Sequence, residues 1–251
     1  MRSVALTTHS LADLLRIVEG QPGGYGHLFR GQGNASWGLT PSLYRIQQVP
    51  VAGGSMESNY DTFEEMALAH FYREAIPYLP PIPRSYSNDR IVAQHFGVPT
   101  RLLDWTRDPL VAAYFASVSG NEEADGAIFM LLPDAHYLPE HVRGPGPHQA
   151  IAFEPPAIDR RIPAQKSVFT FHPYGASGLP FVPLDQRDIG NWITTDGPNV
   201  RGFVKITIPA LAKQTLHSTL IKLGIDRRNL FPGLDGVGAD VAERVRFGGI
   251  V

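Results

Sequence analysis

The chain has 251 residues, of which 43% are hydrophobic and 18% charged, a composition typical of one globular domain with a substantial core. A formal net charge of −2 with interspersed signs gives no basic surface from which nucleic-acid binding could be predicted, although nucleic acid stays open as a substrate. The absence of cysteine excludes disulfide scaffolds, thiolate zinc sites and cysteine nucleophiles.

The N-terminal residues contain too short an apolar stretch for a signal peptide. No later run approaches the roughly 20 apolar residues that a membrane span needs. We therefore expect a soluble, cytoplasmic protein with no membrane partner.

Two helices and a strand are predicted in the first third of the chain. Ser10 followed by Asp13 and spaced leucines predicts a capped helix that stops at Gly20. The first strand is expected at 27–32, after a glycine-rich loop. Residues 57–79 predict a second helix, which prolines end. Its side chains expected to face the interior are Phe63, Met66, Ala67, Ala69, Phe71 and Ala75.

The middle of the chain is the densest stretch of predicted elements. It predicts a short helix over 91–95, a turn, a strand over 101–105 and a helix over 110–116. Asp108 and Pro109 suit the start of the last helix, because an acid favours the positive helix end and proline is tolerated at the first position.

The second half continues with strands. Residues 126–132 form an apolar run expected at the centre of a sheet, and 133–163, rich in Pro, His and Gly, are expected to form a surface excursion. Two more strands are predicted at 167–173 and 203–209. A helix that ends at Gly224 should follow, and then a turn into a last helix.

The order of elements favours a single domain over 1–251, with an N-terminal helix and loop at 1–22. Strands and helices interleave without a strict βαβ rhythm, which favours a mixed α/β or α+β fold over a doubly wound sheet. The two standard phosphate-binding loops are absent, as are HExxH and GxSxG. The histidines are scattered without ligand spacing, so no metal is expected.

Three motifs together resemble the FRG domain, a bacterial and phage family. They are F-R-G at 29–31, W-x-L-x-P-S-x-x-R at 37–45 and QHFGVPTRLLDWTRDPLVAAYFA at 94–116. Later segments agree, with R-I-x-A-Q-x-x-x-F at 161–169 and LFPGLDG at the end of 208–236. The resemblance covers nearly the whole chain, but the family name records a sequence and no activity.

A second resemblance bears on chemistry. ADP-ribosyltransferase-like folds carry an arginine or histidine on the first strand, then a strand-to-helix passage, then a catalytic glutamate before another strand. This chain has the same order in Arg30, the passage from Asp104 into the following helix, and Gln165 at the glutamate position. The resemblance implies a split sheet around a central cleft, NAD as co-substrate, and transfer of ADP-ribose to a protein, a nucleic acid or water.

The residue types suggest a role for each binding candidate. Arg30 presents a charged fork suited to a phosphate or ribose, and Gly31 would let a ligand approach the backbone. His95 and Arg101 flank a turn from which they could project into a cleft. Trp105 could stack on a flat heterocycle, a role that Tyr114 could share for nicotinamide.

The catalytic candidates are Asp104, Thr106, Gln165 and Asp235. Thr106 and Gln165 would orient the ribose through hydrogen bonds. Because a glutamine cannot take a proton or carry negative charge, Asp104 or Asp235 would supply the acid.

Each residue also has a structural interpretation. Arg30 could pair with a carboxylate, and Asp104 could be the buried partner of Arg101. The aromatic residues could belong to the core, His95 could be a satisfied histidine, and Gln165 could satisfy a backbone group. The turn that contains Asp235 is rich in the residues that tight turns need.

Three hypotheses about function remain open from the sequence. The first is an ADP-ribosyltransferase-type enzyme that cleaves the nicotinamide glycosidic bond of NAD. The second is a non-catalytic module that binds a nucleotide or nucleic-acid end in a phage or defence setting, supported by Gln165 in place of glutamate. The third is a hydrolytic, nuclease-like enzyme, which would need a metal.

Overall fold

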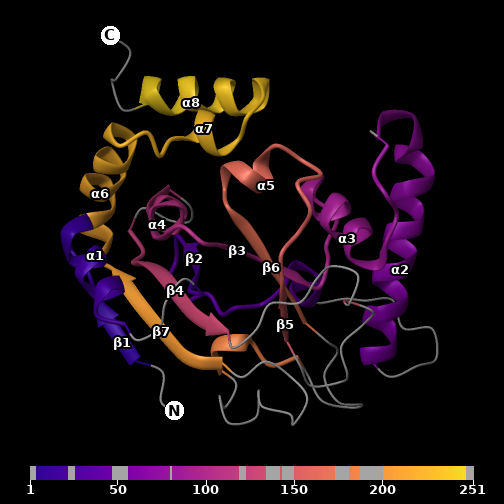
Figure 1. Ribbon diagram of the computed structural model, residues 1–251, viewed down its shortest axis with the longest axis horizontal. Coiled ribbons are helices and arrows are strands. Elements are labelled where there is room, and N and C mark those ends of the chain that lie inside the picture. Colours follow the sequence, from indigo (N-terminus) through magenta and orange to yellow (C-terminus); the bar gives the residue numbers. More distant parts are fainter. Residues whose placement is uncertain are drawn as a thin grey trace.

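The computed structural model describes residues 4–21, 26–46, 56–79, 81–118, 123–133, 142, 150–172, 181–186 and 200–246. In that part of the chain, eight α-helices and seven strands form one α+β domain around a mixed sheet (Figure 1), which confirms the predicted fold class. The strands are β1 (Val4–Thr7), β2 (Leu28–Gln32), β3 (Leu102–Thr106), β4 (Gly126–Pro133), β5 (Ile151–Phe153), β6 (Ser167–Phe171) and β7 (Val200–Ile208). The helices are α1 (Leu11–Glu19), α2 (Met56–Ala75), α3 (Tyr86–His95), α4 (Pro109–Val118), α5 (Arg161–Ala164), α6 (Ala210–Lys222), α7 (Arg227–Leu230) and α8 (Leu234–Arg246).

The sheet has the strand order β1-β7-β4-β2-β3-β6-β5, in which β1 and β7 are parallel and all other neighbours antiparallel. Within the described strands, β2 and β3 share one paired position, Phe29 with Thr106. The β2–β4 and β3–β6 pairs each extend over five positions. The sheet is therefore nearly divided into two halves, β1-β7-β4-β2 and β3-β6-β5. The likeness to ADP-ribosyltransferases stays a prediction.

Helices α1, α4 and α6 cover one face of the first half of the sheet (Figure 1). Their apolar side chains pack with Phe29 of β2 and Ile128 of β4 in one buried cluster. The neighbouring residues Leu28 and Phe129 point to the opposite face and join a second cluster, as the alternation of side chains along a strand requires. A third cluster joins α3 to β3, β5 and β6.

Local signals predicted most of the helix ends and strands correctly. The Ser10 hydroxyl accepts a hydrogen bond from the backbone N–H of Asp13 at 3.1 Å, so the predicted cap of α1 is confirmed. Asp108 accepts from the backbone N–H of Leu110 at 2.8 Å and thereby caps α4. The predicted central strand, β4, pairs on both sides.

Three sequence expectations need correction. The first strand is β1, which precedes α1 and is completed by pairing with the distant β7 rather than by a local signal. Of the predicted surface excursion 133–163, residues 134–141 and 143–149 lie outside the described residues, but Val142 and the whole of β5 are buried. The predicted inward face of α2 is correct only in part, because Phe63, Ala67, Phe71 and Ala75 are half-buried whereas Met66 and Ala69 are exposed. Its buried residues are Glu64, Leu68 and Tyr72, at a spacing of four, whereas Met66 is 66% exposed.

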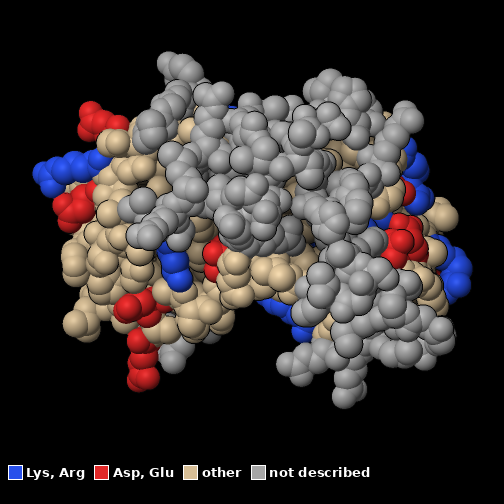
Figure 2. Space-filling view, turned by 90° about the horizontal axis from the view of Figure 1, so that it is seen from below, with Lys and Arg blue, Asp and Glu red and all other residues tan. Residues whose placement is uncertain are grey.

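Basic and acidic side chains lie next to one another on the face drawn in Figure 2, where neither sign gathers among the described residues. This agrees with the interspersed charges of the sequence. In the described part of the chain, no helix has the length and apolar character needed to cross a membrane.

Candidate functional site

A cavity of about 410 Å³ is lined by residues of both halves of the sheet, from β2, β3 and β6, and by residues of α3, α4 and α5. Its volume is in the range of small-molecule sites, about 300–1,000 Å³. Seven of the ten predicted site residues line it, namely Arg30, Gly31, His95, Asp104, Trp105, Thr106 and Gln165. The other three, Arg101, Tyr114 and Asp235, do not.

Arg30 bridges the two halves of the divided sheet. Its Nη1 donates to the carbonyl oxygen of Asp104 at 2.6 Å and lies 3.7 Å from the Asp104 carboxylate. Its Nε is buried and has no hydrogen-bond partner among the described residues. Burial lowers the pKa of Arg30, with Asp104 opposing this, but an arginine keeps its charge in proteins. The guanidinium therefore combines a structural contact between the two halves of the sheet with a positive charge on the cavity wall.

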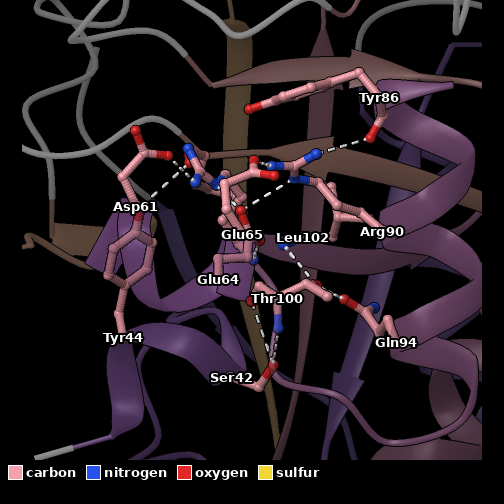
Figure 3. A network of polar contacts seen from close by, with 12 residues as sticks. Ser42, Tyr44, Asp61, Glu64, Glu65, Tyr86, Arg90, Gln94, Thr100 and Leu102 are labelled. Carbon is pink, nitrogen blue, oxygen red and sulfur yellow. Dashed lines mark hydrogen bonds and ion pairs between the residues drawn. The ribbon is translucent and has the colours of Figure 1, made fainter. Parts of the chain in front are cut away.

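Asp104 is held in the cavity by Gln94, whose Nε2 donates to its Oδ1 at 2.8 Å. Gln94 is held in turn by the hydroxyl of Thr100, which donates to Oε1. The backbone N–H of Thr100 donates to the Ser42 hydroxyl at 3.1 Å, and Figure 3 shows Thr100 between Ser42 and Gln94. The carboxylate of Asp104 is thus oriented from a chain of polar side chains, although it stays 59% exposed.

Arg101 belongs to a buried ion network and not to the cavity. Its Nε donates to the Glu64 carboxylate at 2.5 Å and its backbone N–H to the other oxygen at 2.9 Å, while Nη2 donates to Asp61 at 2.8 Å. Nε of Arg90 donates at 3.0 Å to Oε2 of Glu64, the oxygen that also accepts from Nε of Arg101. Arg90 also pairs with Glu65 (Figure 3). The expected salt bridge between Arg101 and Asp104 is therefore wrong, because acids of α2 neutralise Arg101.

Thr106 and Gln165 form a junction between β3, α4 and α5. The Thr106 hydroxyl donates to the Gln165 carbonyl at 2.7 Å and accepts from the backbone N–H of Asp108 at 3.0 Å. The Gln165 amide Nε2 donates to the Leu230 carbonyl at 2.9 Å. Since a carbonyl can only accept, this contact fixes the orientation of the Gln165 amide. Oε1 of Gln165, which lines the cavity, can then accept a hydrogen bond.

His95 meets a carboxylate that the sequence did not single out. Its Nε2 lies 3.4 Å from Oδ2 of Asp159, and both residues line the cavity. Burial lowers the pKa of His95, with Asp159 opposing this and Arg161 adding to it. Burial therefore favours the uncharged form of the imidazole.

The remaining candidates occupy positions with structural explanations. The indole of Trp105 is 2% exposed and donates to the Thr170 hydroxyl at 2.8 Å within the second cluster, so it offers no stacking surface. Tyr114 is fully buried, and its hydroxyl donates to Glu243 at 3.4 Å. Asp235 is exposed in the first turn of α8.

Gly31 lines the cavity but serves helix packing. A Cβ at this position would overlap the backbone carbonyl of Ala112 in α4. The glycine of the F-R-G motif therefore lets α4 lie against β2, which explains the residue without a ligand.

The aromatic surface of the cavity comes from residues that the sequence analysis assigned no role. Phe115 and Phe231 meet edge to face, with ring centroids 6.0 Å apart, and the Arg161 guanidinium lies 5.3 Å from the Phe231 ring. Phe96 is 62% exposed at the end of α3. Phe96, Phe115, Arg161 and Phe231 all occur in the quoted motifs, but nothing local distinguishes cavity aromatics from core aromatics.

In the part of the chain that the structure describes, no three His, Asp or Glu side chains come together as a metal site would require. The expectation that no metal takes part stays a prediction.

Comparison with known proteins adds one finding. Residues 26–125 match the family model of the FRG domain. Searches of curated proteins and of solved structures found no match. The matched range carries Arg30, His95 and Asp104 and ends before Gln165, so the resemblance of the later segments stays a prediction. The chain therefore contains an FRG domain over residues 26–125, as its motifs indicated.

Proposed function

We propose that this protein is an ADP-ribosyltransferase-type enzyme that cleaves the nicotinamide glycosidic bond of NAD and passes ADP-ribose to an acceptor. The observation that carries the proposal is the convergence of Arg30, Asp104 and Gln165 on one cavity, although they are separated by up to 135 positions in the chain. Convergence of charged and polar groups in a concave, largely apolar pocket is typical of an active site.

Arg30, Asp104 and Gln165 each have a role in this reaction, and two aromatic residues add to the site. The positive charge of Arg30 on the cavity wall attracts a phosphate of the dinucleotide. Oε1 of Gln165 accepts from a ribose hydroxyl, and Thr106 positions Gln165 through its backbone. The Asp104 carboxylate, oriented by Gln94, stabilises the positive charge that develops on the ribose as nicotinamide leaves. Phe115 and Phe231 offer an apolar wall for the flat nicotinamide ring.

The test is release of nicotinamide from NAD by the purified protein, followed by chromatography. Arg30→Lys keeps the charge and removes the fork, so we expect turnover to fall, whereas Arg16→Ala on the exposed side of α1 should leave it unchanged. Full turnover in Arg30→Lys and Arg30→Ala would refute the assignment of Arg30.

One observation favours the second candidate, a non-catalytic nucleotide-binding module. Gln165 uses its amide in a contact with Leu230, which suits a residue that shapes a binding cavity. A rise in melting temperature with NAD or ADP-ribose, without any nicotinamide formed, would support this module over the enzyme.

A further inference from the structure

His95 and Asp159 form a fixed pair on the wall of the cavity. His95 is the last residue of α3, and its ring is held edge to face against Phe96, with centroids 4.9 Å apart. Asp159 is held by its Oδ1, which accepts from the backbone N–H of Arg161 at 2.8 Å. Its other oxygen is the one that faces Nε2 of His95. Both side chains are therefore oriented before any ligand binds.

The pair leaves one ring nitrogen available for proton transfer. A carboxylate beside Nε2 favours the tautomer that carries its proton there, so the lone pair lies on Nδ1. Among the described residues Nδ1 has no hydrogen-bond partner, and the side chain is 17% exposed on the cavity wall. This is the arrangement of a general base, in which the carboxylate orients the imidazole and stabilises its protonated form.

The other polar groups of the cavity are less suited to accept a proton. Gln165 has no titratable group, and the carboxylate of Asp104 is engaged by Gln94 and lies beside the Arg30 guanidinium. The charged groups that act on His95 are Asp159, Asp104 and Arg161, and burial is the dominant effect on its pKa. Burial thus favours the neutral imidazole, which is the form that can accept a proton.

We propose that His95, oriented by Asp159, is the general base that activates the acceptor, and that the acceptor is an oxygen nucleophile, water or a hydroxyl group. This inference rests on the proposed function. In the step, the acceptor oxygen bonds to C1′ of the ribose while the C1′–N bond breaks and its electron pair leaves with neutral nicotinamide. The acceptor proton passes to Nδ1 of His95 and is later released to solvent.

The experiment compares NAD cleavage in the wild type, His95→Gln and Asp159→Asn, with His70→Gln on the exposed side of α2 as the matched control. Each protein is assayed across pH and in the presence of sodium azide. Azide is an anion with no proton to lose, so it attacks C1′ without a base and gives ADP-ribosyl azide. Melting temperatures show that the variants are folded.

With water as acceptor we expect His95→Gln to lose about 10²–10⁴-fold in nicotinamide release, the usual contribution of a general base. Asp159→Asn should lose less, because the imidazole is still present. The wild-type rate should fall at acid pH as His95 is protonated, and this dependence should disappear in His95→Gln. Azide should restore release in both variants and form the azide product.

The outcomes separate this inference from the proposed function. Hydrolysis by His95→Gln with the wild-type rate and pH dependence would overturn the base role and leave the enzyme assignment intact. Loss that azide does not restore in folded protein would also overturn it, because His95 would then act in binding. No release by the wild type at any protein concentration would overturn the proposed function, and the acceptor step with it.

Discussion

Replacing Glu64 by glutamine should strongly destabilise the fold. Glu64 is fully buried and is the shared partner of Arg90 and Arg101, which are 1% and 2% exposed. The substitution keeps the volume and removes the charge that neutralises two buried guanidinium groups. Removing one partner of a buried ion pair typically costs about 3–5 kcal/mol. Because Asp61 and Glu65 still contact the arginines, we expect about 3 kcal/mol, near the lower end.

The assay is equilibrium unfolding in urea. With a slope of about 2–3 kcal/mol per M, a loss of about 3 kcal/mol lowers the midpoint by about 1–1.5 M. Glu74→Gln on the same helix is the matched control, because its side chain is 66% exposed and its described ion pair is with the exposed Arg73. Its effect on stability should stay within about 0.5 kcal/mol. If Glu64→Gln moved the midpoint no further than Glu74→Gln, the buried carboxylate would not stabilise the fold by neutralising Arg90 and Arg101.

Three other predictions follow from contacts described above. Gly31→Ala should lower the melting temperature, because the added methyl group would meet the Ala112 carbonyl. Gly238→Ala, at an open position on helix α8, should instead raise the stability by about 0.5–1 kcal/mol. Equal effects of the two substitutions in calorimetry would contradict this prediction. Burial lowers the pKa of His217, so the unfolded state takes up a proton at this residue before the folded state does, and stability should drop as the pH falls below 6.5. The drop in urea midpoint between pH 8 and pH 5.5 should therefore be smaller in His217→Gln than in the wild type. An equal drop in both proteins would contradict this prediction. Thr106→Val should reduce nicotinamide release while Thr106→Ser retains it, because the hydroxyl group of Thr106 donates to the Gln165 carbonyl. Equal rates of release by the two variants would show that this hydroxyl has no role in the site.

The sequence predicted those parts of the fold that depend on local patterns. Caps identified the starts of α1 and α4, and a continuous apolar run identified β4. The family motifs placed Arg30, His95 and Asp104 among the site residues. Apolar spacing predicted the inward face of α2 only in part, because the most buried position of that face is held by Glu64. Its partners lie 26 and 37 positions further along the chain, so only the folded structure reveals why a carboxylate is buried there.

Contacts between distant segments also decided which site residues were missed. Asp159 carries no motif of its own and reaches His95 only because α5 packs over the cavity. Arg101 looked like a ligand-binding residue because its acidic partners come from α2, far earlier in the chain. Charged residues near a motif are therefore ambiguous until their partners are known.

The single paired position between β2 and β3 has a consequence for the mechanics of the domain. Strands that share few hydrogen bonds can open locally at a lower free energy than the rest of a sheet. Native-state hydrogen exchange should therefore resolve two cooperative units, with the boundary at Phe29 and Thr106. Arg30 of β2 connects the two units through its hydrogen bond to the Asp104 carbonyl of β3. A ligand that contacts both halves of the sheet would slow hydrogen exchange in both units. Hydrogen exchange would therefore detect ligand binding to the cavity even when the reaction is unknown.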